Sequence, residues 1–353
     1  SPDAARTSAI FGIHGLARRA SRVWCLTGTP APNHPGELWV LARALGLTRL
    51  THEKWVARYC VGYQTRWNFR VTVARKEGLP ELRQMLEDSG AFLRRRKAEV
   101  LQDLPPLRWA QVPLEPGPLS ASLPAEELEA LVEKAAEEEP LVHRLLEDLS
   151  KDPDPARLAG ALEVLAPSVS ALRRLVGLQK VSPAIELLQD ELECGALSKV
   201  VVFAIHRDVI EALAVELDPF GAVVIHGGTS ASGREEAVRR FQEDPRSQVF
   251  IGNIQAAGVG ITLTAAADVV VVESPWVPGD LAQAVMRVHR LGQTAGSVLA
   301  RVLVLEGSID ERVAAIVARK ARELAQLLGD SALESSTSDA SKNFTPTFLT
   351  STL

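Results

Sequence analysis

The second half of the sequence predicts an α/β fold built on a parallel β-sheet. Five apolar, β-branched runs follow Pro183, and amphipathic stretches such as His206–Leu217 and Gly233–Gln242 lie between most of them. Continuous Val and Ile runs that alternate with helices are typical of parallel strands buried on both faces. We therefore expect a doubly wound sheet that binds ligands at the carboxyl ends of its strands. The expected strands are Lys199–Ala204, Ala222–Ile225, Gln248–Ile251, Val269–Val272 and Val298–Leu305.

The first half of the sequence is predicted to be mainly helical. Residues 22–26 form an apolar run before a Thr-Gly-Thr-Pro turn, which indicates a buried strand entering a tight loop, with Cys25 as a buried thiol. Residues 37–45 predict a helix. From 51 to 179 the chain is charged and interrupted by prolines, and Glu126–Glu139 has the apolar spacing of an amphipathic helix with an acidic outer face. The Ser/Thr-rich stretch from Gly329 onward predicts a disordered tail.

The composition limits the class of protein. Its three cysteines are widely spaced without a CxxC pair, which excludes a disulfide framework or a zinc ribbon and suits a reducing cytosol. No apolar run approaches the ~20 residues that cross a bilayer. The net charge is −5, but residues 126–148 contain nine acidic residues against two basic ones, so the rest of the chain is mildly basic. The overall charge therefore does not exclude a nucleic-acid partner.

One predicted helix has the residue pattern of an anion site. Asp280 is a good N-cap and Gly292 a good helix end, so about three turns lie between them. At ~100° per residue, Gln283, Arg287 and Arg290 fall within about 60° of one another. No carboxylate stands four residues from either arginine. Such a guanidinium pair can stabilise a transferring phosphoryl group. The alternative is a solvated basic face, with Gln283 closing a capping box on Asp280.

A glycine-containing loop precedes this helix. Gly258 and Gly260 follow the strand that ends at Ile251, and two glycines so close together let backbone amides approach a phosphate. Thr262 or Thr264 would add a hydroxyl donor. A tight turn between a strand and a helix would use the same residues, so the loop by itself leaves both readings open.

Six segments in a fixed order resemble the motifs of one enzyme family. They are similar to the carboxy-terminal half of the Swi/Snf-type (superfamily 2) DNA-dependent ATPases, in particular the annealing-helicase and fork-remodelling branch. The segments are Leu26–Trp39, Phe92–Pro106, Lys199–His206, His226–Phe241, Gly258–Pro278 and Gln283–Gln293. The resemblance implies the end of a first RecA-like lobe at 1–50, helical protrusions and a linker at 51–182, and a second RecA-like lobe at 183–328. The disordered tail would occupy 329–353.

The resemblance also implies catalytic and nucleotide-binding residues. Arg287 and Arg290 would be arginine fingers, assisted by Gln283, that reach ATP held by the other lobe. We expect their guanidinium groups to face the carboxyl ends of the strands, outside local ion pairs. Gly258 and Gly260 would lie with them at the nucleotide.

Further residues are implied at the DNA and between the lobes. Those implied at the DNA are Thr262, Thr229, His206, Arg207, Arg94 and Arg95. Those implied in lobe coupling are Thr27, Gly28 and Thr29. Glu273 and Val277 depart from the family's usual Asp and Asn, which puts the geometry of the loop before the arginine helix in question.

The implied cofactors are ATP and Mg²⁺, and the implied partners are double-stranded or forked DNA and the first RecA-like lobe. The chain contains no G-x-x-x-x-G-K-[ST] loop, so no part of it is predicted to cradle the β- and γ-phosphates or to position the metal. We expect the sequence to be cut from a longer protein just upstream of Ser1, and the chain alone to be inactive as an ATP hydrolase. The implied function is the motor half of an enzyme that translocates on duplex DNA and remodels, anneals or reverses DNA structures in repair and at replication forks.

A non-catalytic DNA- or protein-binding module derived from a helicase lobe is the alternative. A P-loop encoded upstream of Ser1 would favour the enzyme. No metal site and no membrane partner are predicted for the chain itself. The cysteine usage and the excess of arginine over lysine predict a cytoplasmic protein from a GC-rich bacterium. The resemblance to DNA-acting enzymes implies that it is nucleoid-associated.

Overall fold

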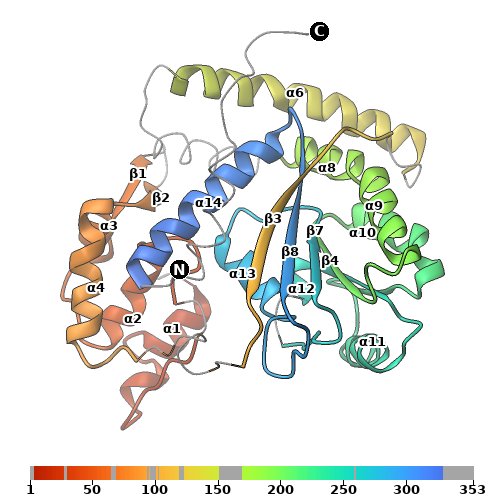
Figure 1. Ribbon diagram of the computed structural model, residues 1–353. Coiled ribbons are helices and arrows are strands. Elements are labelled where there is room, and N and C mark those ends of the chain that lie inside the picture. The colour runs from red at the N-terminus through yellow and green to blue at the C-terminus, as the bar shows by residue number, and fades with distance from the viewer. Residues whose placement is uncertain are drawn as a thin grey trace.

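Six parallel strands form the central sheet of the computed structural model (Figure 1). The structure describes residues 4–27, 30–64, 69–93, 95, 101, 103–118, 123–150, 169–257 and 260–328. The strands are β3 (Leu107–Leu114), β4 (Val200–Ala204), β5 (Val223–Ile225), β6 (Val249–Asn253), β7 (Asp268–Val271) and β8 (Val298–Leu305). Their order is β3-β8-β7-β4-β6-β5, so β4 lies between β7 and β6. The five predicted strands and the parallel α/β fold are confirmed.

Helices cover both faces of this sheet. They are α8 (Ser170–Gln179), α9 (Val181–Glu193), α10 (Arg207–Glu216), α11 (Ala231–Glu243), α12 (Ile254–Ala257), α13 (Pro278–Val285) and α14 (Ile309–Leu328), with a short η5 turn (Asp218–Phe220) after α10. The connection from β4 to β5 runs toward the β5 edge of the sheet, whereas the connections from β5 to β6, β6 to β7 and β7 to β8 run toward the β3 edge. Because such connections are right-handed, α10 lies on one face of the sheet and α11–α13 lie on the other. α8 and α9 pack with α10. Val200–Val202 and Val269–Val272 are fully buried between these layers, which explains why the strands are continuously apolar.

A smaller, mainly helical module lies beside the sheet (Figure 1). It contains α1 (Ala5–Phe11), η1 (Leu16–Arg18), η2 (Pro35–Leu38), α2 (Trp39–Ala44), α3 (His52–Tyr59), η3 (Lys76–Gly78), α4 (Leu79–Asp88) and the antiparallel pair β1 (Cys60–Gln64) and β2 (Phe69–Ala74). Trp55 and Leu82 are fully buried in its core, which also includes Leu324 and Leu327 of α14. α14 therefore joins the sheet to the module.

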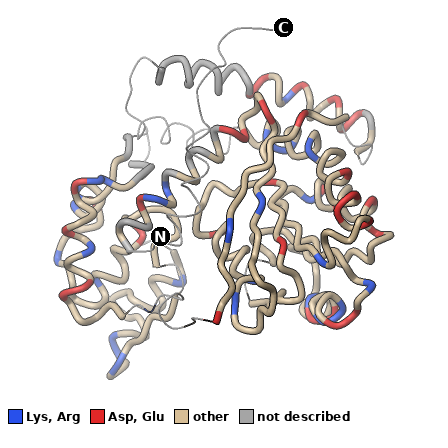
Figure 2. Tube along the Cα trace, in the orientation of Figure 1, with Lys and Arg blue, Asp and Glu red and all other residues tan. Residues whose placement is uncertain are grey.

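The predicted acidic helix is confirmed as part of α6 (Ala125–Ser150), which crosses one end of the sheet (Figure 1). Leu131 and Ala135 are buried, whereas Glu129 and Glu133 are exposed. Figure 2 shows acidic residues in red along this helix. The negative charge of the chain is therefore concentrated on one element.

Two expectations for the first half are wrong. The resemblance implies a helical linker at residues 107–114, but these residues form β3, which pairs with β8 from Leu107 and Val298 onward. The proline within β3 is tolerated because this strand is at the sheet edge. Residues 22–26 form no strand: Trp24 is 80% and Leu26 is 89% exposed, and Cys25 is exposed as well. An apolar run is buried as a strand only beside another strand, and no described strand pairs with this one.

The division of the chain into lobes and protrusions stays a proposal. The tail predicted at 329–353 lies outside the described residues. Within the part of the chain that the structure describes, every helix is too short or too polar to span a bilayer.

Candidate functional site

The helix predicted to carry the arginines is shorter than its sequence pattern implies. α13 begins at Pro278, two residues before the N-cap predicted at Asp280, and ends at Val285. Proline is favoured in a first helical turn because its missing N–H would have no helical partner there. Beyond Val285 the turns tighten, and the Arg287 N–H donates to the Ala284 carbonyl at 3.1 Å. The arginines therefore lie on a turn that follows the helix.

Both arginines are half-buried and bind neutral groups of the chain. Arg287 donates from Nε to the Gln283 carbonyl at 3.2 Å. Arg290 donates from Nη1 to the Ile261 carbonyl at 3.1 Å and to the Thr262 hydroxyl at 3.0 Å. Neither arginine makes an ion pair with any described residue. Their positive charges are therefore not neutralised by a described carboxylate.

The positively charged guanidinium groups of Arg287 and Arg290 lie close enough to repel each other. Burial lowers the pKa of Arg287, and the nearby charge of Arg290 lowers it further. An anion bound against this pair would relieve the repulsion and replace lost solvation. Arg287 keeps both Nη groups, and Arg290 keeps Nε and Nη2, without a hydrogen bond to a described residue. These planar, forked donors match the oxygens of a phosphate.

The arginine turn lies at the amino edge of the sheet, so the expectation that it faces the carboxyl ends is wrong. Arg290 contacts the segment that enters β7, and the adjacent His289 Nε2 lies 2.8 Å from the Pro105 carbonyl, just before β3. The reason is that α13 links the end of β7 to the start of β8 and must return the chain across the sheet. β7 alone spans roughly 13 Å. An anion bound by these arginines is therefore not held at the carboxyl edge of this sheet.

The predicted glycine loop packs against the arginine turn. The Leu263 N–H donates to the Arg287 carbonyl at 2.9 Å. Gly260 has a φ of 80° and open space where a Cβ would stand, so its backbone angle, not crowding, favours glycine. Gly258 lies outside the described residues. The structure thus brings together four of the predicted residues: Gly260, Thr262, Arg287 and Arg290.

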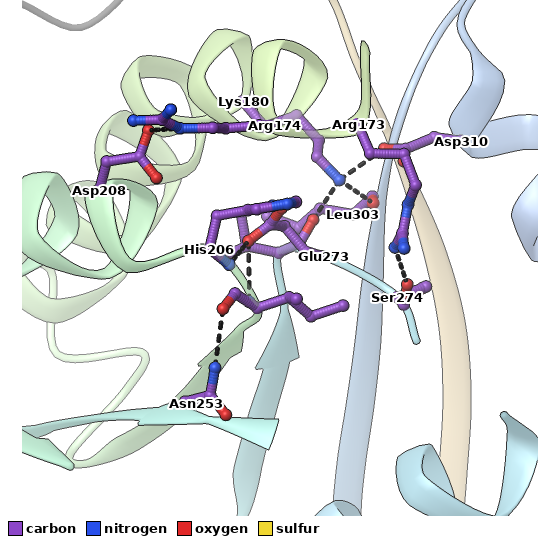
Figure 3. A network of polar contacts seen from close by, with 12 residues as sticks. Arg173, Arg174, Lys180, His206, Asp208, Asn253, Glu273, Ser274, Leu303 and Asp310 are labelled. Carbon is purple, nitrogen blue, oxygen red and sulfur yellow. Dashed lines mark hydrogen bonds and ion pairs between the residues drawn. The ribbon is translucent and has the colours of Figure 1, made fainter. Parts of the chain in front are cut away.

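His206 lies at the opposite, carboxyl edge of the sheet, where the side chains of Glu273 and Asn253 bind its loop (Figure 3). Glu273 follows β7, is 3% exposed, and accepts hydrogen bonds from the N–H groups of Ile205 and His206, each at 2.8 Å. Its second oxygen lies 2.5 Å from His206 Nδ1. Asn253, at the end of β6, donates to the Ile205 carbonyl at 2.7 Å. The loop after β4 is therefore fixed from both neighbouring strands.

The carboxylate of Glu273 is ionised in this environment. Burial by itself would raise its pKa, but the hydrogen bond and charge of His206 and the two backbone N–H donors outweigh burial and lower the pKa. α8 covers the carboxylate closely, since a Cβ at Gly177 would stand 2.6 Å from Glu273 Oε1. Glu273, which the family usually replaces by Asp, is therefore an organising residue of this edge.

Thr229 and Arg207, both implied at the DNA, also follow strands at the carboxyl edge. The Thr229 hydroxyl accepts from the His226 N–H at 3.0 Å in the turn after β5. The Thr229 carbonyl accepts from Arg234 Nε at 3.1 Å. Arg207 begins α10 and is exposed, with its Nε 2.6 Å from the Glu211 carboxylate. Exposed pairs of this kind contribute little stability, so a phosphate can compete for the guanidinium.

A buried lysine that sequence reasoning missed supports the segment between β7 and α13 (Figure 3). Lys180 is 1% exposed and donates to the Val272 carbonyl and, at 3.3 Å, to the Leu303 carbonyl. Its Nζ lies 2.5 Å from the Asp310 carboxylate. A lysine between the apolar residues of α8 and α9 could have indicated a buried cation, but the groups that bind it are distant in the sequence.

Arg173 holds the same segment from α8 (Figure 3). It donates from Nη2 to the Ser274 carbonyl at 2.6 Å, and its guanidinium carbon lies 5.1 Å from the centre of the Trp276 ring. Burial lowers the pKa of Arg173, while the charges of Glu273 and Asp310 act in the opposite direction. α8 and α9 thus fix the segment that leads into α13.

The remaining predicted residues are only partly placed. Thr27 and Arg95 are exposed, and Gly28, Thr29 and Arg94 lie outside the described residues. Their roles in lobe coupling and DNA contact stay predictions.

The described residues fit one end of the implied cofactor. The arginine turn offers cations to a triphosphate. No group of three or more His, Cys, Asp or Glu side chains within the described ranges could hold a metal ion. The described donors of the arginine turn therefore offer positive charge to an anion, and a nucleotide at this turn stays a proposal.

Comparisons with known proteins place these features in a family. The SNF2-related domain matches residues 14–116, and the helicase conserved C-terminal domain matches residues 183–292. The chain is 32% identical over 316 residues to the DNA annealing helicase and endonuclease ZRANB3 of Bos taurus, covering 87% of this chain and 27% of that protein.

A second curated relative and one solved structure are also similar to the chain. The SWI/SNF-related matrix-associated actin-dependent regulator of chromatin subfamily A-like protein 1 of Xenopus tropicalis is 31% identical over 319 residues, which are 88% of this chain and 31% of that protein. The solved Sulfolobus solfataricus SWI2/SNF2 ATPase core in complex with dsDNA matches with a TM-score of 0.44 and 20% identity, over 85% of this chain and 60% of that one. The chain thus spans about a third or less of the two curated relatives. It belongs to the Snf2-type (superfamily 2) helicase family and is similar to its annealing-helicase and fork-remodelling branch.

Proposed function

We propose that this chain is the carboxy-terminal motor half of a DNA-dependent ATPase that translocates on double-stranded DNA and remodels, anneals or reverses DNA structures. The observation that carries the proposal is the arginine turn, in which Arg287 and Arg290 meet the loop at Thr262 without a described carboxylate partner. In this proposal the pair acts as arginine fingers toward ATP held by a P-loop lobe. Mg²⁺, held mainly by that lobe, would supply charge neutralisation at the phosphates.

Two features support a covering lobe that presents the nucleotide. The arginines lie at the amino edge of this sheet, so their anion must be brought by another part of the protein. Trp24 and Leu26 expose apolar surface in the segment that resembles the end of the first lobe. A first RecA-like lobe packed there would bury both side chains and add the strand partner that residues 22–26 lack.

The proposal expects the DNA contacts at the carboxyl edge. His206, Arg207 and Thr229 follow β4 and β5 there. Thr262 lies at the arginine turn on the opposite, amino edge, so a DNA contact there would be separate from this group. Gln283 would help couple the nucleotide contact to lobe closure. The named relatives are animal proteins, so the bacterial source and nucleoid location stay predictions.

The chain itself is expected to bind duplex DNA without sequence preference. Phosphate contacts release counterions, so affinity should fall by about 10²-fold or more between 50 and 200 mM salt. Because the net charge is −5, such binding would require a localised basic surface. Fluorescence anisotropy with two duplexes of unrelated sequence measures this directly. Absence of binding at low salt would overturn the proposed DNA contact.

A matched pair of surface arginines locates the contact. Arg207→Gln is expected to reduce the salt slope by about one, whereas Arg246→Gln should leave it unchanged. Both arginines are exposed and both pair with a nearby carboxylate. Arg246 follows α11 and lies in no segment implied at the DNA. An equal effect of the two substitutions would contradict the assignment of the carboxyl edge.

The chain alone is not expected to hydrolyse ATP. It has no P-loop, so nothing in it grips the β- and γ-phosphates. Phosphate release by the pure chain, with duplex DNA present, should stay at background. Release above background would show that this chain suffices for hydrolysis and that a second lobe is not required.

A further inference from the structure

Both carboxylate oxygens of Glu273 bind the short loop at Ile205 and His206. Oε2 accepts from the N–H groups of Ile205 and His206, and Oε1 faces His206 Nδ1. A buried charge is costly unless it is hydrogen-bonded, and these three donors meet that need. All three donors come from the loop that ends β4, although Glu273 itself follows β7 (Figure 3). The carboxylate therefore fixes the position of this loop relative to the segment that leads to α13.

This arrangement decides which nitrogen of His206 is left for a ligand. An ionised carboxylate can only accept hydrogen bonds, so Nδ1 must carry a hydrogen. Nε2 remains, and it can donate to a phosphate oxygen when it carries a hydrogen as well. His206 is also the N-cap of α10, and the first N–H groups of a helix favour anions.

We propose that Glu273 is a positioning residue for the DNA backbone: it holds His206 so that Nε2 meets a phosphate. The inference rests on the DNA binding proposed above. Glu273 acts through His206 and does not itself touch the DNA.

Glu273→Gln keeps the shape of the side chain and removes its charge. The variant chain is expected to bind a short duplex about tenfold more weakly, with a salt slope reduced by about one, because one cationic phosphate contact is lost. His206→Gln should cause the same two changes. The double variant should lose no more than either single variant, since both remove one coupled contact.

Glu138→Gln is the matched control. Glu138 is also a buried acid, 6% exposed, and it accepts from the N–H groups of Ala171 and Leu172 at 3.4 and 2.8 Å, at the start of α8. This substitution should lower the urea midpoint but leave DNA affinity and salt slope unchanged. Glu273→Asp keeps the charge and should retain the wild-type slope.

The outcomes separate this inference from the proposed function. If Glu273→Gln binds DNA as the unmodified chain does, or if Glu138→Gln weakens binding equally, the positioning role is overturned while DNA binding stands. If the unmodified chain does not bind duplex DNA, both fall together. If Glu273→Gln does not fold, the other two variants decide. A reduced salt slope of DNA binding in His206→Gln, together with a wild-type slope in Glu273→Asp, would support the positioning role of Glu273. Any other result would overturn it.

Discussion

Arg290→Ala in the full-length protein is expected to lower the DNA-stimulated kcat for ATP hydrolysis by roughly 10³-fold or more, the effect of an arginine finger in other phosphoryl-transfer enzymes. The guanidinium would stabilise charge that develops on the γ-phosphate, so its loss should act on kcat more than on the KM for ATP. A steady-state phosphate-release assay at saturating duplex DNA measures both constants. DNA affinity of the variant should stay close to that of the wild type.

Arg290 also has a structural contact, and a second variant separates the two roles. Its Nη1 donates to the Thr262 hydroxyl at 3.0 Å. Thr262→Val removes that hydrogen bond and keeps the guanidinium, so at saturating DNA it should cost less than about tenfold in kcat, in line with one neutral hydrogen bond. If Thr262→Val were as inactive as Arg290→Ala, the arginine would act by holding the loop. An unchanged kcat in Arg290→Ala would remove the finger role altogether.

Lys180→Met is expected to destabilise the chain by about 3–5 kcal/mol, the cost of leaving one partner of a buried ion pair uncompensated. Lys180 is 1% exposed, and its ammonium group satisfies Asp310, the Val272 carbonyl just after β7 and the Leu303 carbonyl of β8. Methionine fills similar volume without the charge or the donors. The free energy of unfolding, from urea titrations followed by circular dichroism, measures the loss as a fall in midpoint at unchanged m.

Two comparisons show whether the buried charge is the cause. Adding Asp310→Asn to Lys180→Met removes the stranded carboxylate and should restore part of the lost stability. Arg83→Gln breaks an exposed pair with Glu87 four residues on, and should change stability by under about 0.5 kcal/mol. Equal effects of Lys180→Met and Arg83→Gln would contradict the importance of the Lys180 network.

Much of the sheet could be predicted because β4 to β8 are apolar runs between helices, and burial on both faces leaves that trace in the sequence. β3 could not, since its proline and its exposed Arg108 and Gln111 resemble a loop. It is a strand because β8, far along the chain, offers a full parallel edge. The apolar run at 22–26 shows the converse: the right residues form no strand where no neighbour is present.

The α/β class, the arginine pair, the glycine loop and the resemblance that the family matches confirm could all be predicted from the sequence, because they depend on residue types at short spacing. Tertiary structure alone decided that the arginine turn lies at the amino edge, that Glu273 holds His206, and that Lys180 is buried beside Asp310. Periodicity reports which face of an element is buried. Contacts between distant segments follow from strand order and crossover direction, which no local pattern encodes.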